Sequence, residues 1–260
     1  VILWGAMLIG WSGCAVPRSP EVIKAPPVHL FLLAGQSNMA GRGGITADRR
    51  EPIEGVMALQ QDGSWGSAID PLHWDKGVAG VGLARSFARA YQQNHPGVIV
   101  GFIPAACGGS PLEMWEQGAY FAATKSHPYD DAIARAHHAA NLSGGTLMGV
   151  LWHQGEADSR PERAEGYRKG LESLIARFRR DLGDARLPFV LGQLGRFAGK
   201  EWDESRAQVD AAHQAIAAGD PNIAFADAEG LTSNPDMVHF DAKSLDEFGR
   251  RYARAWEELE

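Results

Sequence analysis

The sequence predicts a doubly wound α/β fold, in which helices cover both faces of a five-stranded parallel sheet. Five short runs of Val, Ile, Leu and Phe are continuously apolar, as strands buried on both faces of a parallel sheet usually are. Longer segments with the apolar spacing of helices lie between these runs. Strands that alternate with helices are typical of parallel sheets with right-handed crossovers, so both observations favour one class.

The predicted strands are spread along the whole chain after residue 27. They are Val28–Ala34, Val98–Ile103, Thr146–Trp152, Phe189–Leu194 and Ile223–Asp227. With helices on both faces, five such strands indicate a three-layer, flavodoxin-like α/β/α arrangement. Ligands of these open sheets bind outside the carboxyl ends of the strands, so the residues that follow each strand are the first candidates for a site.

Apolar side chains at helical spacing predict the helices between the strands. The stripes are Leu83, Phe87 and Tyr91; Tyr167, Leu171, Leu174, Ile175, Phe178 and Leu182; Val209, Ala212 and Ile216; and Leu245, Phe248, Tyr252, Trp256 and Leu259. Two segments lack this rhythm. We expect residues 44–80 to form an elaborated insertion near the site, and residues 110–128 to be a long irregular stretch.

Composition narrows the class of protein and of partner. The chain has 260 residues, of which 45% are apolar and 22% charged, as in a soluble globular protein. A net charge of −7 argues against nucleic acid and anionic membrane surfaces as the main partners. Two cysteines cannot form a disulfide framework. A chain of this length forms one large domain or two small ones, and we expect a single domain over residues 28–260.

Residues 1–27 are expected to be an export segment followed by a linker. An apolar run from Val1 to Ile9 precedes small residues and Cys14, a pattern similar to a bacterial lipoprotein signal whose cysteine carries the lipid anchor. The run is too short to span a bilayer, and a Pro-rich spacer, Pro17–Pro27, follows it. The expected location is therefore outside the cytoplasm, in the periplasm, on the cell surface or secreted; the alternative is a frayed apolar N-terminus.

Ser37 is the candidate nucleophile. The apolar run from Phe31 stops at Gly35, and Gln36, Ser37 and Asn38 follow in a short polar turn. A strand end fixes a hydroxyl group while the turn exposes it, which is what a nucleophile needs. The alternative is a serine that only caps the next helix.

His239 is the candidate base, because it lies just before the last helix, where the chain returns to the carboxyl edge of the sheet. His153, directly after a strand, is its rival. Asp236, three residues earlier, can reach the imidazole and fix its tautomer. Glu156, which also follows a strand, is a second candidate for this orienting acid, and the sequence leaves both open.

Three groups are candidate donors to an oxyanion. They are the backbone N–H of Ser37, a backbone N–H of Gly108 or Gly109, and the side-chain amide of Gln154. The alternatives are an ordinary glycine turn and an amide that binds only loop backbone. No metal-ligand spacing and no phosphate-binding glycine motif is found, so we expect neither a metal nor a cofactor.

Four motifs in this order resemble a known superfamily: Gly-Gln-Ser-Asn-Met-Ala-Gly, Cys-Gly-Gly-Ser-x-x-x-x-Trp, Trp-His-Gln-Gly-Glu-x-Asp and Asp-x-x-His. They are similar to those of SGNH/GDSL hydrolases, and more narrowly to the sialate O-acetylesterase-like group, which includes the acetyl xylan esterases of carbohydrate esterase family 6. The resemblance implies Ser37 as nucleophile, His239 as base, Asp236 as orienting acid with Glu156 also implicated, and Gly108 or Gly109 at the oxyanion. Gln154 stands where the superfamily's oxyanion asparagine is expected.

The reaction implied by the resemblance is hydrolysis of acetyl esters on sugar hydroxyls, through an acetyl-serine intermediate and without a metal. Acetylated xylan or a related plant polysaccharide is the expected substrate, and acetylated sialic acid the alternative. The candidate substrate-binding residues are Gln36, Asn38, Trp74 and Trp115, and Trp65, Tyr120 and Trp202 could also stack on sugars. Aromatic residues that merely anchor loops are the competing interpretation. A non-catalytic carbohydrate-binding protein and a lipase-like or thioesterase enzyme are rival functions.

Overall fold

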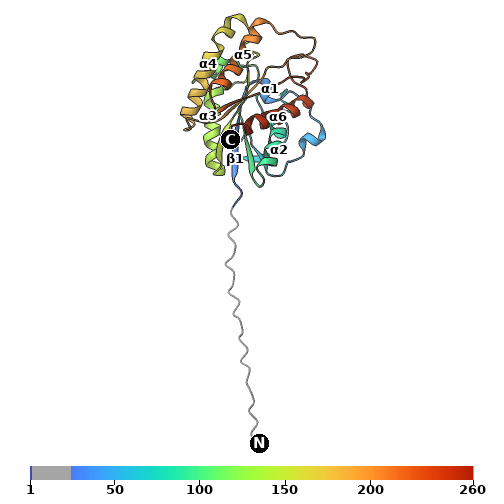
Figure 1. The fold of residues 1–260 in the computed structure, drawn as a ribbon, viewed down its shortest axis with the longest axis vertical. Helices are drawn as coiled ribbons and strands as arrows, with labels where there is room; N and C mark the ends of the chain where they lie inside the picture. Colours follow the sequence, from blue (N-terminus) through green and yellow to red (C-terminus); the bar gives the residue numbers. More distant parts are fainter. Residues whose placement is uncertain (2–24, 260) are drawn as a thin grey trace.

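A seven-stranded sheet lies at the centre of the computed structural model, which describes residue 1 and residues 25–259 (Figure 1). The strands are β1 (Val28–Gly35), β2 (Val56–Leu59), β3 (Trp65–Ser67), β4 (Ile99–Pro104), β5 (Thr146–His153), β6 (Phe189–Gly192) and β7 (Ile223–Ala226). Their order across the sheet is β3-β2-β4-β1-β5-β6-β7. All neighbouring pairs are parallel except β2 and β3.

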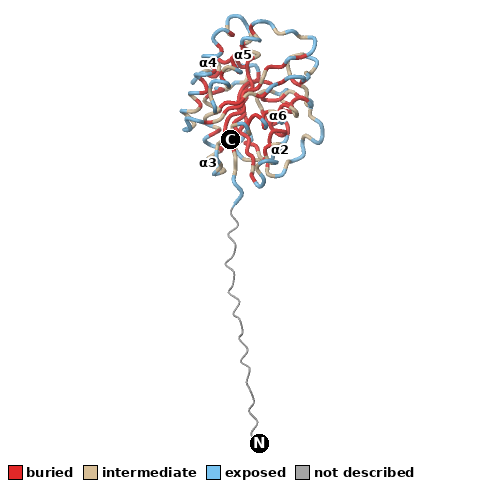
Figure 2. The backbone as a smooth tube through the Cα atoms, viewed as in Figure 1, coloured by how far each residue is buried: buried red, intermediate tan, exposed pale blue. Residues whose placement is uncertain are grey.

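The five predicted strands are confirmed, and each boundary agrees within two residues. They are adjacent in the sheet, in the order β4-β1-β5-β6-β7, which is the strand order of a flavodoxin-like sheet. The middle of β1, from Leu30 to Leu33, is completely buried because helices cover both of its faces. Figure 2 shows this burial along the central strands.

The segment 44–80 is more regular than expected. Its strands β2 and β3 form a hairpin that extends the sheet beyond β4, so the sheet has seven strands and is mixed, where we expected five. The Asp62-Gly63 turn closes this hairpin, and Gly63 has the positive φ of 83° that such a turn requires. The prediction missed the hairpin because its strands have only four and three residues.

Helices form a layer on each face of the sheet (Figure 1). The helices are α1 (Ser37–Ala40), α2 (Ala84–Asn94), α3 (Pro128–Ser143), α4 (Pro161–Asp181), α5 (Glu204–Gly219) and α6 (Ala242–Glu257), with short 3-10 turns at Ala47–Arg50 and Leu112–Trp115. Phe87 of α2 and Trp256 of α6 pack edge-on against Phe31 of β1, on one face. On the other face α3, α4 and α5 cover the sheet with Tyr129, Phe178 and Ile216. The stripes that predicted α2, α4, α5 and α6 are thus confirmed, whereas α3 was not predicted by an apolar stripe.

The predicted export segment, its Cys14 and the linker up to residue 24 lie outside the described residues, and these predictions stay open. Among the residues that are described, no helix has the length and the apolar character needed to cross a membrane.

Candidate active site

Ser37 lies at the carboxyl end of β1, the middle strand of the sheet. β1 ends at Gly35, whose φ is 125° and whose absent Cβ would lie 2.1 Å from the carbonyl oxygen of His153. Only glycine permits this close approach of β1 and β5. The N–H of Gln36 then donates to the same carbonyl at 2.8 Å, and Ser37 begins α1. Its hydroxyl is thus fixed by a buried strand.

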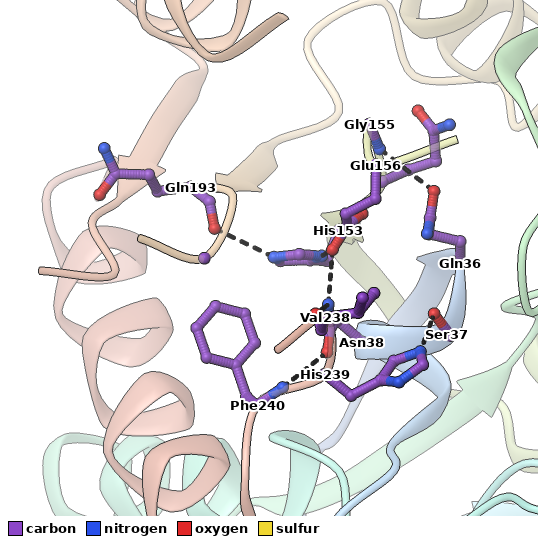
Figure 3. A network of polar contacts seen from close by, with 12 residues as sticks. Gln36, Ser37, Asn38, His153, Gly155, Glu156, Gln193, Val238, His239 and Phe240 are labelled. Atoms are coloured by element: carbon purple, nitrogen blue, oxygen red, sulfur yellow. Dashed lines mark hydrogen bonds and ion pairs between the residues drawn. The ribbon is translucent and has the colours of Figure 1, made fainter. Parts of the chain in front are cut away.

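His239 and Asp236 reach Ser37 from the loop between β7 and α6. The Nε2 atom of His239 lies 2.9 Å from Ser37 Oγ (Figure 3). The Nδ1 atom of the same ring lies 2.6 Å from Asp236 Oδ2. The other carboxylate oxygen, Oδ1, accepts the backbone N–H groups of Val238 and His239, both at 2.9 Å. Ser37, His239 and Asp236 are therefore joined by hydrogen bonds, although Ser37 and His239 are 202 positions apart in the sequence.

The charge of Asp236 determines whether His239 can accept the proton of the Ser37 hydroxyl. Burial opposes its ionisation, but the backbone N–H and imidazole of His239 and the N–H of Val238 outweigh burial and lower the carboxyl pKa to about 2. An ionised Asp236 accepts the Nδ1 proton, which leaves the Nε2 lone pair directed at the hydroxyl of Ser37. The arrangement can accept a proton from the serine as its oxygen attacks a carbonyl carbon.

Glu156, the other candidate orienting acid, has different partners. Its Oε1 accepts the side-chain N–H of Asn38 at 2.5 Å and lies 3.9 Å from Nδ1 of His153. In the described part of the chain it makes no hydrogen bond to His239, so the contact that orients the imidazole comes from Asp236. The rival base His153 is fully buried and bonds through Nε2 to the backbone of Gln193, away from Ser37.

Gln36 and Asn38, which flank Ser37, hold neighbouring loops. Asn38 donates to the carbonyl of Val238 at 3.2 Å and accepts the N–H of Phe240 at 3.1 Å, so it grips the chain on both sides of the catalytic histidine candidate. Gln36 Oε1 accepts the N–H groups of Gly155 and Ala157. Asn38 is buried and uses both atoms of its side-chain amide within the fold, which contradicts the prediction that it binds substrate (Figure 3). The Nε2 atom of Gln36 has no hydrogen-bond partner among residues 25–259, so for Gln36 substrate binding stays a prediction.

Gln154 is also buried and occupied. Its amide nitrogen donates to the carbonyl of Ser110 at 3.1 Å and to the carboxylate of Asp158, and its oxygen accepts the hydroxyl of Tyr167 at 2.7 Å. Both amide protons therefore have acceptors inside the fold. The prediction of Gln154 as an oxyanion donor is contradicted by these contacts, which are the loop-binding alternative.

The two candidate glycines differ in their partners. Gly108 donates its N–H to Oδ2 of Asp75 at 2.8 Å. Ser110 N–H closes a turn on the Cys107 carbonyl at 3.1 Å, with Gly109 at φ 82° as its third residue, which is a type II turn. The N–H of Gly109 has no hydrogen-bond partner among residues 25–259 and lies on an exposed residue. Ser37 N–H, at the first position of α1, is likewise outside the helical bonds.

The aromatic candidates mostly anchor loops. Trp115 is completely buried, bonds through Nε1 to Ser110, and packs edge-on against Trp152, so the prediction that it binds substrate is wrong. Trp74 is half-buried, and the guanidinium of Arg135 lies over its ring at 4.9 Å. Tyr120 is 54% exposed and remains free to meet a ligand at the surface.

The sequence reasoning missed Asp75 and Arg42, which contact the turn that carries Gly109. Asp75 lies in the irregular segment 44–80, where no periodicity relates it to a strand end. Arg42 follows the nucleophile motif directly, in the glycine-rich stretch Gly41-Arg42-Gly43-Gly44. Its position beside the motif was the one signal that could have indicated it.

Comparisons with known proteins identify the family and the fold of this chain. A family model described as "Carbohydrate esterase, sialic acid-specific acetylesterase" matches residues 27–258. A protein of Arabidopsis thaliana named as a probable carbohydrate esterase is 30% identical over 251 residues, which are 89% of this chain and 91% of that protein. A crystal structure of an Arabidopsis thaliana protein, also 30% identical, superposes with a TM-score of 0.77 and covers 89% of this chain and 98% of the other.

Two more distant structures share the fold. NanS superposes with a TM-score of 0.68 at 18% identity, over 90% of this chain and 98% of NanS. A carbohydrate acetylesterase from Xanthomonas citri superposes with a TM-score of 0.67 at 22% identity, over 90% of this chain and 56% of that protein. At these identities the likeness concerns the architecture alone.

Proposed function

This chain belongs to the carbohydrate esterase family of the sialic acid-specific acetylesterases and is a carboxylic ester hydrolase, and we propose that Ser37 is the nucleophile with which it deacetylates carbohydrates. The observation that carries the proposal is the hydrogen-bonded chain from Ser37 Oγ to His239 Nε2 and from Nδ1 to Asp236, with distances of 2.9 and 2.6 Å. A serine, a histidine and an aspartate joined by hydrogen bonds in this order activate the serine hydroxyl for attack on an ester.

The proposed reaction has two steps. Ser37 Oγ attacks the acetyl carbonyl while His239 Nε2 takes the hydroxyl proton, and the oxyanion is held by the N–H groups of Ser37 and Gly109. The tetrahedral intermediate collapses, the C–O bond to the sugar breaks, and the leaving sugar oxygen receives the proton from Nε2. Water, deprotonated by the same nitrogen, then attacks the acetyl-serine, which releases acetate and restores Ser37.

We propose acetylated xylan or a related plant polysaccharide as the substrate. The site supports a large substrate because it is open: the side chains of His239 and Asp236 are 24% and 48% exposed. An open groove of about 750 Å³, lined by Ile216 and Ile223 together with charged side chains such as Arg179, lies between α4 and α5 at the amino ends of the strands, away from Ser37.

Acetate release tests the proposal. We expect the wild-type chain to release acetate from acetylated xylan, the Ser37→Ala variant to release none, and a control variant in the β2–β3 turn, Ser64→Ala, to match the wild type. Faster release from O-acetylated sialic acid would assign the alternative substrate. Full activity of Ser37→Ala would refute the mechanism, and failure of a fluorophosphonate probe to label Ser37 in an inactive wild type would indicate a non-catalytic binding protein.

A further inference from the structure

A buried ion pair lies directly against the Gly108–Gly109 turn. Asp75 Oδ2 accepts the N–H of Gly108 and an Nη2 proton of Arg42, both at 2.8 Å. The two charged side chains are 2% and 8% exposed, respectively. A Cβ at position 108 would lie 2.5 Å from Asp75 Oδ2 and 2.3 Å from Arg42 Nη2, so the ion pair leaves room for nothing larger than glycine.

This contact determines which way the turn faces. The N–H of Cys107 is bound by the carbonyl of Gly35 at 2.8 Å, which extends the pairing of β4 with β1. Asp75 holds the next N–H, that of Gly108, on the other side. With both of these groups fixed, the central peptide of the turn has one orientation, and the N–H of Gly109 is the donor that stays unused within the described residues.

Arg42 connects the same pair to the other two parts of the site. Its Nη1 donates to the carbonyl of Gly41 at 2.7 Å, and the N–H of Gly41 binds the carbonyl of Ser37 at 2.9 Å. Its backbone carbonyl accepts the side chain of Asn234, on the loop of His239, at 2.9 Å. Through its side chain Arg42 therefore links the nucleophile turn to the Gly108–Gly109 turn, and through its backbone it contacts the histidine loop.

The charges explain why both residues are needed. A carboxylate is a stronger acceptor for the Gly108 N–H than a neutral group and holds it more firmly. A lone carboxylate one residue from Gly109 would also repel the negative charge that forms on the substrate oxygen. The guanidinium of Arg42 cancels this repulsion while the hydrogen bond remains.

We propose that Arg42 and Asp75 are a positioning pair, which fixes the Gly108–Gly109 turn so that Gly109 N–H meets the oxyanion. This inference rests on the proposed function of Ser37. In the described part of the chain, neither side chain hydrogen-bonds the Ser37 hydroxyl or the imidazole of His239. The pair acts through the turn, so its loss lowers kcat for a small aryl acetate and leaves KM and the pH profile, which depends on His239 and Asp236, unchanged.

Three variants separate positioning from a merely structural ion pair. Arg42→Met leaves the Asp75 carboxylate unneutralised, and we expect kcat to fall on the order of 10²-fold or more. Arg42→Met/Asp75→Asn removes both charges and keeps an acceptor for Gly108 N–H, so kcat returns to within about tenfold of the wild type. Arg42→Met/Asp75→Leu also removes both charges but has no acceptor, so kcat stays on the order of 10²-fold low.

The two double variants are the decisive comparison, because both lack a buried charge and their side chains at position 75 have the same number and branching of heavy atoms. Their KM values should agree while their kcat values differ, and the melting temperature of each variant checks that it folds. A control, Arg179→Met/Asp220→Asn, removes an ion pair near the amino ends of the strands and should leave kcat unchanged. Equal kcat values for the Asn and Leu doubles, with Ser37→Ala inactive, overturn the positioning inference alone. An active Ser37→Ala overturns the proposed function as well.

Discussion

Replacement of Asp236 by asparagine is the sharpest test of the proposed site. The asparagine Oδ1 can still accept the N–H groups of Val238 and His239, which now bind Asp236 at 2.9 Å, so the loop keeps its shape. Its NH₂ group would face Nδ1 of His239, where the carboxylate oxygen lies at 2.6 Å. Nδ1 then becomes an acceptor, the proton moves to Nε2, and the nitrogen that faces Ser37 can no longer take its proton.

The size of the effect follows from this tautomer and from exposure. The same exchange in a buried Ser-His-Asp triad lowers kcat by about 10⁴-fold. Asp236 is 48% exposed here, so water can replace part of its contact, and we expect a loss on the order of 10²- to 10³-fold. The assay is the initial rate of 4-nitrophenyl acetate hydrolysis, with melting temperature as a check on folding.

Glu156→Gln is the matched control for this experiment. The amide keeps an oxygen that can accept the side-chain N–H of Asn38, the contact that Oε1 makes at 2.5 Å, so only a few-fold loss is expected. An Asp236→Asn variant with wild-type kcat, or a Glu156→Gln variant that is equally impaired, would contradict the assignment of Asp236 as the carboxylate that orients His239.

Three further changes probe the support of the site. Asn38→Ala removes the hydrogen bonds to the backbone of Val238 and Phe240 and should lower kcat. It should also lower the free energy of unfolding in urea by roughly 2–3 kcal/mol, and unchanged stability would contradict this prediction. Gly35→Ala places a Cβ 2.1 Å from the carbonyl oxygen of His153, so we expect the free energy of unfolding to fall by more than about 3 kcal/mol and esterase activity to be lost. A wild-type melting temperature would refute this. Burial lowers the pKa of His213 from 6.5 to about 3, so as the pH falls the unfolded chain binds a proton at His213 before the folded chain does. Stability is therefore lost as the pH falls from about 6.5 towards 3, by at most ~1.4 kcal/mol per pH unit, and His213→Gln should flatten the urea-measured profile over this range.

The fold was predictable where one physical signal dominates. A strand buried on both faces is continuously apolar, and this signal predicted the five strands β1, β4, β5, β6 and β7. β2 and β3 have four and three residues, and Met57 and Trp65 within them are only half-buried, so an edge hairpin and an irregular loop look alike in sequence. The turn signal at Asp62-Gly63 was visible, but nothing local related it to Val100 of β4, with which β2 pairs.

The site was predictable in its place more than in its contacts. Ser37, Asp236 and His239 were expected together because each follows a strand whose carboxyl end lies at the same edge. The partners of polar side chains are a different matter. Gln154 would have the same sequence context whether its amide faced a substrate or, as here, Ser110 and Asp158, because those partners lie on other loops.

The loops around the site show why so many of its amide and acid side chains bind backbone groups. Where parallel strands end, backbone N–H and C=O groups lose their sheet partners and need new ones. Gln36 binds the N–H groups of Gly155 and Ala157, Asn38 the backbone on both sides of His239, and Asp75 the N–H of Gly108. Among the described residues, the N–H groups of Ser37 and Gly109 are left out of this pairing, and they lie beside the nucleophile and on the oxyanion turn. A motif rich in Gln and Asn at a strand end therefore locates a site, while in the proposed mechanism the oxyanion donors are backbone groups that those side chains leave free.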